Sequence, residues 1–481
     1  MGKIHQVQTA VAASFGSFLT GLLYVWPSYT TSIYTHPNTT VLSAPMTHVE
    51  ISLIGSLPSL GAMLGTAVTG MIMNAFGRHK GGLILLLPFL LSWIMVELTN
   101  SSIVILMARF IAGIPCGGFL VYGPIFISEV AEESIRGTLA TGPVVLYCLG
   151  VLLSYVIGWF LTYRYILWTN LACSCIGLGL AMMVTESPVW LIRQKRDEDA
   201  RLAIAHYRGV SPGSKIVLGE ISRLKLQINP AVELISVNDG NTKAEEAEKE
   251  KLNVDENVIE TPEKMSSIKL LFVSPSCRRA FVVTGLALTL QVMMGMIVVQ
   301  VYAADIFSQA APTLSSDFCS VMFAFVLLFG SVMSAVFSDR FGRRFLIILS
   351  SVGVALCLFG MGLLLQTNIL PPWVTAIIIL VYCFAFMFGA GSVPYVLLAE
   401  VFVPEVQGLA AMLLMEWVWL LNFILLGIFP FMLKFFGIHG AFYCFTIFGI
   451  LNALVGIFLL PETKGLTNEQ IQESFLGRRK T

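Results

Sequence analysis

Long apolar segments follow one another along most of the chain, and short polar stretches separate them. A helix needs about 20 mostly apolar residues to cross ~30 Å of hydrocarbon. Twelve stretches reach that length, near residues 7–29, 50–73, 82–99, 103–127, 138–160, 165–184, 280–302, 318–337, 345–366, 373–398, 409–433 and 440–460. The pattern therefore predicts an all-α membrane protein with twelve transmembrane helices.

The longest polar stretch divides the predicted spans into two groups of six. We expect an N-terminal bundle over residues 1–184, a linker over 185–278, a C-terminal bundle over 279–460 and a tail over 461–481. The first part of the linker mixes charges with apolar residues at helical spacing, which predicts short amphipathic helices. Residues 238–264 are highly charged without an aromatic residue, so disorder is expected there. This segment is either a regulatory element or a tolerated flexible insertion.

Three polar motifs recur in the same order after matching spans of the two halves. NAFGRHK (74–80) is answered by SDRFGRR (338–344), SEVAEESIRG (128–137) by AEVFVPEVQG (399–408), and ESPVWL (186–191) by PETKG (461–465). Matching positions lie about 270 residues apart, and the offset drifts slowly, as expected when two copies of one unit diverge by loop insertions. Such a duplicated membrane unit is typical of a transporter.

Composition and charge support this interpretation and orient the chain. Of 481 residues, 56% are hydrophobic and only 12% charged, which is too apolar for a domain with a polar surface. All Lys and Arg except Arg109, Arg164 and Lys434 fall on the side that carries both termini, so we expect cytosolic termini. The opening segment has no cleavage site and is expected to remain as a span. The first outside loop then holds Asn38, the first residue of an Asn-Thr-Thr glycosylation acceptor.

Several function classes find no support in the sequence. The nine cysteines and six histidines are scattered without metal-ligand spacing, so neither a metal site nor a disulfide framework is expected. No cofactor is expected, and no P-loop or catalytic constellation indicates an enzyme. The formal net charge of zero gives no reason to expect nucleic acid as a partner. The expected partners are a small-molecule substrate and the lipid bilayer, with no obligate protein partner.

Five motifs at span boundaries carry a family resemblance. They are RFIAGIPCGG in the fourth span, GPIFISEV running into Arg136-Gly137, ESPVWL after the sixth span, SDRFGRR after the eighth and PETKG after the twelfth. In this order the set resembles the sugar-porter family of the major facilitator superfamily, over essentially the whole chain. Trp26-Pro27-Ser28 and the RGTLAT that opens the fifth span are similar to the insect facilitative trehalose-transporter branch. The resemblance implies two six-helix bundles that work by alternating access in the plasma membrane.

The resemblance also implies a network of charged residues that gates the cytosolic side. Its expected pairs are Arg78 with Glu129, Arg136 with Glu462 and Arg343 with Glu400, and its further members are Glu186, Asp339 and Arg344. We expect these groups to pair across the facing surfaces of the two halves and to hold the inner side shut. A simpler interpretation is that they are positive-inside anchors. At Gln407 the repeat predicts arginine, so Glu186 would lack its cross-half partner and the gate would be asymmetric.

The expected substrate site lies at the bilayer midplane between the halves. By motif position, the resemblance assigns to it Gln291, Tyr395 and Trp419, with Asn422 one turn beyond the tryptophan. Several polar positions of the family pattern are apolar here, namely Val144, Val292, Ile297 and Val418. The site is therefore less polar than a sugar site should be.

Four further residues lie at a similar depth. Gln300, Tyr302 and Tyr147 are candidates for the site, and packing is the alternative role for an isolated aromatic residue such as Tyr147. Glu416 is an acid inside an apolar helix, and it is either functional or a charge that reaches the cytosolic surface.

The preferred function is facilitative transport of a sugar such as trehalose or glucose. Proton-coupled members of the family typically carry an acid in the first span, and FGSFLTGLLYVWPS has none. Arg109 and Glu97 are expected near the outer ends of spans four and three, in reach of each other or of water. Two alternatives stay open: a transporter of a less polar organic solute, and a non-transporting sugar sensor that keeps the fold.

Overall fold

The structure is a computed structural model that describes residues 2–37, 39–228, 267–367, 369–464, 466 and 468–475. All regular elements in these residues are helical. The N-terminal half comprises α1 (Gly2–Thr35), α2 (His48–Glu97), α3 (Ser102–Val130), α4 (Glu133–Ala140), α5 (Gly142–Phe160) and α6 (Tyr163–Met182). A capping box starts α2, because Thr47 and Glu50 each accept the other's backbone N–H.

The C-terminal half repeats this order with more interruptions. It comprises α12 (Pro275–Met293), α13 (Met296–Val301), α14 (Ala303–Ala310), α15 (Ser316–Phe341), α16 (Arg343–Thr367), α17 (Pro372–Ala385), the π-helical segment η2 (Phe386–Ala390), α18 (Val393–Glu400), α19 (Pro404–Phe458) and α20 (Asn468–Phe475). Gly295 separates α12 from α13 because it adopts a left-handed conformation with φ 82°.

The twelve predicted spans are confirmed. Ten helical stretches are long and apolar enough to cross a membrane. Two of them, α2 and α19, each contain two spans, because Gly77 (φ 85°) and Gly437 (φ 68°) leave the helical conformation inside them. The predicted boundaries differ most where helices extend beyond the apolar core, as at the start of α1.

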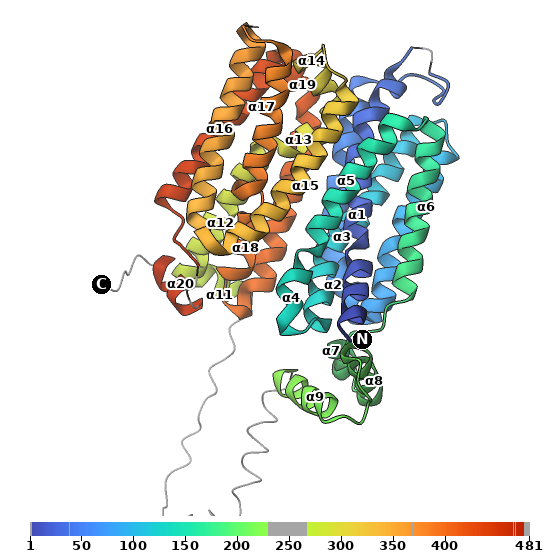
Figure 1. Cartoon of the computed structure of the whole chain (residues 1–481), viewed down its shortest axis with the longest axis vertical. Helices are drawn as coiled ribbons and strands as arrows, with labels where there is room; N and C mark the ends of the chain where they lie inside the picture. The colour runs from blue at the N-terminus through green and yellow to red at the C-terminus, as the bar shows by residue number, and fades with distance from the viewer. Residues whose placement is uncertain are drawn as a thin grey trace, which may run out of the picture.

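The two halves stand side by side with their long helices roughly parallel (Figure 1). Within the N-terminal half α1 packs on α5 and α3, and α2 packs on α3; within the C-terminal half α16 packs on α19. The halves meet where α19 contacts α2 and α15 contacts α5. The N-terminus and α20 lie at the same end of the molecule, which we call the terminal face.

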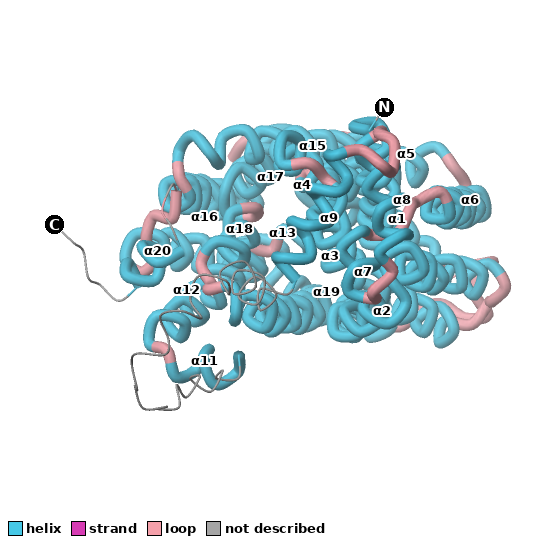
Figure 2. The backbone as a smooth tube through the Cα atoms, turned by 90° about the horizontal axis from the view of Figure 1, so that it is seen from below, coloured by secondary structure: helices cyan, strands magenta, loops and turns pink. Residues whose placement is uncertain are grey.

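Short helices of the linker lie beneath the N-terminal half at the terminal face (Figures 1 and 2). They are α7 (Pro188–Arg193), α8 (Asp197–Arg208) and α9 (Lys215–Ile228), whereas α11 (Ser267–Val273) lies under the C-terminal half. The apolar face of α8 is buried, and the Gln6 side chain of α1 donates to the backbone carbonyl of Tyr207 at 2.8 Å. The linker helices are therefore fixed to the first span.

Hydrogen bonds between described residues join the halves from about the middle of the spans toward the face opposite the termini. Trp419 Nε1 donates to Thr66 Oγ1, Gln300 Nε2 to Tyr147 Oη, Tyr155 Oη to the Gln300 carbonyl, and the Ala304 N–H to Ser28 Oγ. This conformation is thus held together on the side away from the terminal face.

Two predictions fall on residues outside the described part of the chain. These are the glycosylation acceptor Asn38 and the charged segment 238–264.

Candidate functional site

The first repeated motif forms a tight turn between the second and third spans. Gly77 adopts φ 85° and ψ −178°, a combination that is essentially restricted to glycine. The turn directs the next two backbone N–H groups, of Arg78 and His79, onto the Glu186 carboxylate at 2.6 and 3.2 Å. A Cβ on Gly77 would overlap Glu186 Oε2. The carboxylate thus satisfies the free donors at the start of a helix, where negative charge is also favoured.

The side chain of Arg78 completes this turn by reaching the end of α3. It holds Glu129 with two parallel hydrogen bonds, Nε to Oε2 at 2.8 Å and Nη2 to Oε1 at 2.6 Å. The two side chains are only 4% and 11% exposed. Ser187 donates to the same Glu129 carboxylate at 2.5 Å. We call Gly77, Arg78, Glu129, Glu186 and Ser187 the N-clasp.

The second repeat builds the same arrangement in the other half. Gly342 has φ 86°, and Glu462 accepts the backbone N–H groups of Arg343 and Arg344 at 2.9 and 3.2 Å. The Arg343 side chain donates to Glu400 at 2.7 Å, and Thr463 donates to the other oxygen of Glu400 at 2.8 Å. These residues, Gly342, Arg343, Glu400, Glu462 and Thr463, form the C-clasp. Asp339 lies in the last turn of α15, just before this turn.

The structure places two of the expected pairs within the halves rather than across them. The predicted pairs of Arg78 with Glu129 and of Arg343 with Glu400 are present, but each lies within one half. Arg136 does not meet Glu462; its Nη2 donates to the Ala131 carbonyl at 3.2 Å. The physical reason is that the glutamates after the sixth and twelfth spans return to helix starts of their own half, whose free N–H groups bind them.

The same geometry revises the role of Glu186. A missing arginine at position 407 leaves Glu186 without the expected cross-half cation, yet the carboxylate is fully engaged by the N-clasp. The two clasps are therefore alike, and the expected asymmetry of the pairing across the halves stays a prediction.

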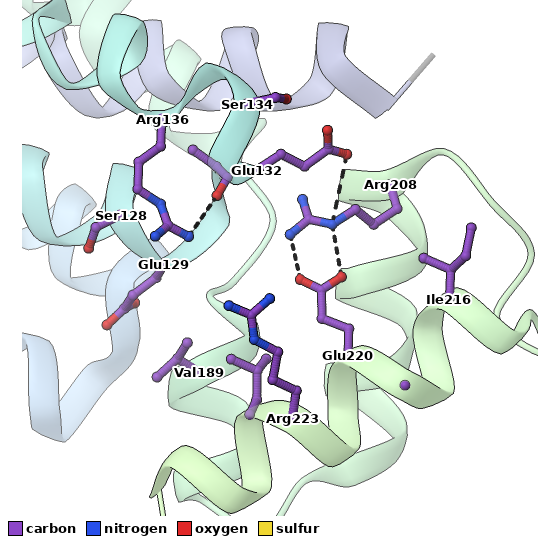
Figure 3. Close-up of a pocket in the computed structure, with 13 residues that line it drawn as sticks. Ser128, Glu129, Glu132, Ser134, Arg136, Val189, Arg208, Ile216, Glu220 and Arg223 are labelled. Carbon is purple, nitrogen blue, oxygen red and sulfur yellow. Dashed lines mark hydrogen bonds and ion pairs between the residues drawn. The ribbon is translucent and has the colours of Figure 1, made fainter.

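A cavity of about 640 Å³ lies at the terminal face beside the N-clasp. Figure 3 shows Arg136 from α4 on one side and Arg208 and Arg223 from α8 and α9 on the other. Arg208 forms two hydrogen bonds with Glu220, at 2.9 and 2.5 Å, and a weaker ion pair with Glu132 at 4.0 Å. The bonds to Glu220 join α8 to α9, whereas the contact with Glu132 and a hydrogen bond from Arg208 Nη1 to the Val130 carbonyl at 3.1 Å connect the linker to the N-terminal half.

The predicted substrate-site residues of spans seven and ten lie together. Gln291 in α12 is 7% exposed, and its Nε2 lies 3.5 Å from the carbonyl of Gly391, next to the start of α18. Its side chain also lies beside the hydroxyl of Tyr395, which is 36% exposed. Gln291 Oε1 is buried without a hydrogen-bond partner among the described residues. An unused amide acceptor next to a phenol is suited to a ligand hydroxyl.

Trp419 reaches the opposite half. Its ring stacks on Tyr24 of α1 with a centroid distance of 6.4 Å and an interplanar angle of 9°, and its Nε1 donates to Thr66 at 3.1 Å. Asn422, one turn beyond, is buried. The indole therefore belongs to the interface between the halves, where an alternating-access transporter binds its substrate.

Several interface residues were missed by the sequence reasoning. Tyr147 was expected to be a packing residue or a ligand contact, and its hydroxyl accepts from Gln300 across the interface at 2.7 Å. Tyr24, Thr66 and Tyr155 were not considered, because none of them occupies a recognised motif position. A polar residue inside an apolar span is the signal that could have marked them.

Arg109 and Glu416 are charged residues that lie within predicted spans. The expectation that Arg109 lies near the outer surface in reach of Glu97 is wrong: Arg109 is 1% exposed inside the N-terminal half, and Glu97 pairs with Arg164 at 3.4 Å. Glu416 is partly buried, and its Oε1 has no hydrogen-bond partner in the described part of the chain.

The sequence matches the family described as Sugar (and other) transporter over residues 9–475. The match includes both clasps and all the interface residues. The chain belongs to the sugar (and other) transporter family.

Similar proteins of this family include trehalose transporters of insects. The chain is 26% identical over 488 residues to "Facilitated trehalose transporter Tret1" of Polypedilum vanderplanki, covering 98% of this chain and 88% of that protein. It is 25% identical over 481 residues to the protein of the same name from Drosophila virilis, again over 98% of this chain but only 49% of the relative. The chain thus spans about half the length of some relatives that it matches.

Solved structures of the xylose transporter XylE from E. coli share the fold of this family member. The partially occluded inward open conformation superposes with a TM-score of 0.76 at 21% identity, over 96% of this chain and 99% of XylE. The proton:xylose symporter XylE bound to 6-bromo-6-deoxy-D-glucose gives 0.70 at 21% identity, over 99% and 100% of the two chains. The chain therefore has the major facilitator fold, with two six-helix bundles.

Proposed function

We propose that this protein is a uniporter that carries a sugar, such as trehalose or glucose, across the plasma membrane by alternating access. The terminal face is assigned to the cytosol by the positive-inside rule. Substrate binds between the halves and is recognised by Gln291, Tyr395, Trp419 and Asn422. The clasps keep each six-helix bundle rigid while the two bundles rock against each other.

One observation supports this proposal most: the C-terminal half of a duplicated transporter fold carries both a stacked indole at the interface and a buried amide acceptor without a partner among the described residues. Trp419 lies at the interface with its ring stacked on Tyr24 of α1, and Gln291 keeps Oε1 free beside the Tyr395 hydroxyl. An aromatic face and buried amides are what a pyranose needs. The names of the relatives point to the same class of substrate. Val292 and Val418, which suggested a less polar site, are as buried as Gln291 and do not by themselves indicate an apolar ligand.

Uptake by cells that express the protein tests the proposal. Labelled trehalose, glucose and xylose, and a panel of less polar solutes, are compared at matched surface expression with cells that lack the protein. Uptake of a sugar supports the proposal. Uptake restricted to less polar solutes overturns the substrate class, and saturable binding without uptake overturns transport in favour of a sensor.

We expect uptake to equilibrate rather than to concentrate the sugar, because the first span carries no acid that could couple protons. A protonophore should leave the initial rate unchanged. The measurement is the ratio of internal to external sugar at steady state. Accumulation that the protonophore abolishes contradicts this prediction and directs attention to Glu416, the partly buried acid of α19.

Loss of either recognition residue should weaken sugar uptake. Gln291→Ala removes the amide and should raise the apparent KM about ten- to a hundredfold, equivalent to roughly 1–3 kcal/mol. Trp419→Ala removes the stacking face and should do similar harm. Trp417→Ala is the matched control, because this tryptophan on the same helix is 44% exposed and bonds to Thr289 within its own half. Unchanged uptake in both Gln291→Ala and Trp419→Ala contradicts this placement of the site.

A further inference from the structure

Arg109 is a fully buried cation in the fourth span that has no carboxylate partner. It lies on α3, and the described residues form no ion pair with it. Nη1 donates to the backbone carbonyl of Leu23 at 2.8 Å, and Nε donates to the backbone carbonyl of Ile54 at 3.0 Å. The guanidinium also lies over the ring of Trp26, at 5.3 Å from its centroid. Burying an arginine within a membrane span without a carboxylate partner costs free energy, and its two hydrogen bonds to carbonyls offset part of that cost.

Both carbonyls have lost their normal helical donor. In an α-helix the carbonyl of residue i accepts the N–H of residue i+4. The residue four positions after Leu23 is Pro27, and the residue four positions after Ile54 is Pro58. Both prolines lie inside helices, α1 and α2, and neither has an N–H to donate. Arg109 thus binds the very two carbonyls that these prolines leave unpaired.

This correspondence has a clear energetic basis. A buried carbonyl without a donor is costly inside a membrane, where water is not available to replace the lost hydrogen bond. A proline also bends its helix, because the ring clashes with the carbonyl of residue i−4. One planar guanidinium can donate in two directions, so a single side chain can serve both helices.

We infer that Arg109 is a positioning residue that joins the proline breaks of spans one and two and so fixes the bends of both helices together. It touches no substrate. It acts through the two helices that the other half contacts: α1 meets α13 and α14 close to the Ser28 hydrogen bond, and α2 meets α19. Coupled bends keep these two contact surfaces aligned when the bundles rock.

The C-terminal half contains a comparable device without a charge. Tyr382 of α17 is fully buried, and its hydroxyl donates at 2.9 Å to the carbonyl of Met294, where α12 ends at the Gly295 break. Met294 ends the first helix of the C-terminal half, and Leu23 lies in the first span of the N-terminal half. In each half a side chain from the fourth span of that half therefore binds the broken carbonyl of its first span. The C-terminal half uses a tyrosine for one carbonyl, whereas the arginine of the N-terminal half binds two carbonyls that prolines leave unpaired.

The test compares the loss of stability on replacing Arg109 in the presence and in the absence of Pro27 and Pro58. Arg109→Met deletes the donors while keeping a long apolar side chain, and the unfolding midpoint of the detergent-solubilised protein should fall by several degrees. In the Pro27→Ala/Pro58→Ala background the carbonyls regain helical donors, and the fall should shrink by more than half. Pro88→Ala, at the other proline of α2, is the matched control and should give no such relief.

A second measurement separates positioning from general stability. At matched surface expression, Arg109→Met should lower the maximal rate of labelled trehalose uptake while leaving the KM near the wild-type value, and the Pro27→Ala/Pro58→Ala background should restore part of that rate. The unfolding measurement needs no substrate, so it decides the inference even if the protein carries a different solute.

Two results overturn the inference. One is an equal fall in the unfolding midpoint with and without the prolines, which would mean that the charge or the volume of Arg109 matters rather than its two carbonyl partners. The other is equal relief by Pro88→Ala. If Arg109→Met yields no folded protein, recovery of folded protein in the triple variant becomes the readout, and its absence there counts against the inference in the same way.

Discussion

Gly77→Ala is expected to destabilise the N-terminal half by about 3 kcal/mol, because the backbone conformation alone costs roughly 1–3 kcal/mol for any other residue and the charged hydrogen bonds to Glu186 are disturbed as well. The Cβ would overlap Glu186 Oε2, and the carboxylate can move aside only by releasing the N–H groups of Arg78 and His79. Gly342→Ala should do the same to the C-clasp, where Glu462 occupies the equivalent place. The measurement is the unfolding midpoint of the solubilised protein, together with surface expression.

Gly70→Ala is the control for this prediction. Gly70 lies on the same helix α2, and no atom lies within 4 Å of the Cβ that alanine would add. Alanine is a better helix former than glycine by roughly 1 kcal/mol, so this change should be neutral or slightly stabilising. If Gly77→Ala proves as harmless as Gly70→Ala, the clasp geometry does not contribute to stability.

Glu129→Gln is the second change with a large expected effect. It leaves the guanidinium of Arg78, only 4% exposed, without a compensating charge. Breaking a buried ion pair by removing one partner costs about 3–5 kcal/mol. We therefore expect a large fall in the unfolding midpoint and a loss of transport in proportion to the folded protein that is lost. Arg78→Gln in the same chain should reverse part of the damage, since it removes the uncompensated charge.

An exposed ion pair of the same half provides the comparison. Glu97→Gln removes the charge that faces Arg164, whose side chain is 76% exposed. Pairs of this kind contribute about 0–1 kcal/mol, so little change is expected. Equal effects of Glu129→Gln and Glu97→Gln would show that the N-clasp does not depend on its buried ion pair.

The clasps lie within single halves, and this limits which contacts change when the halves move. Each clasp connects the turn after its half's second span, the end of the fourth span and the segment after the sixth span of that half. Since these contacts stay within one half, they need not break when the halves rock. The hydrogen bonds that must change are those of the interface, such as Trp419 with Thr66 and Gln300 with Tyr147.

The sequence by itself determined the membrane architecture and identified the charged residues of each clasp, but not Ser187 and Thr463. Apolar runs of membrane-spanning length identify spans without any knowledge of packing, because in a bilayer the backbone must satisfy its own hydrogen bonds and forms helices. The repeat placed a glycine, an arginine and a glutamate at matching boundaries, and the pairs of Arg78 with Glu129 and of Arg343 with Glu400 followed from the family resemblance.

Only the tertiary structure decided which partner each of the remaining polar groups finds. Glu186 and Glu462 bind backbone N–H groups of their own half, and Arg109 binds carbonyls that Pro27 and Pro58 leave free. Backbone donors and acceptors are present at every residue, so the sequence does not indicate which of them a break or a helix start exposes near a given side chain. That depends on how distant helices approach one another, which span patterns do not encode.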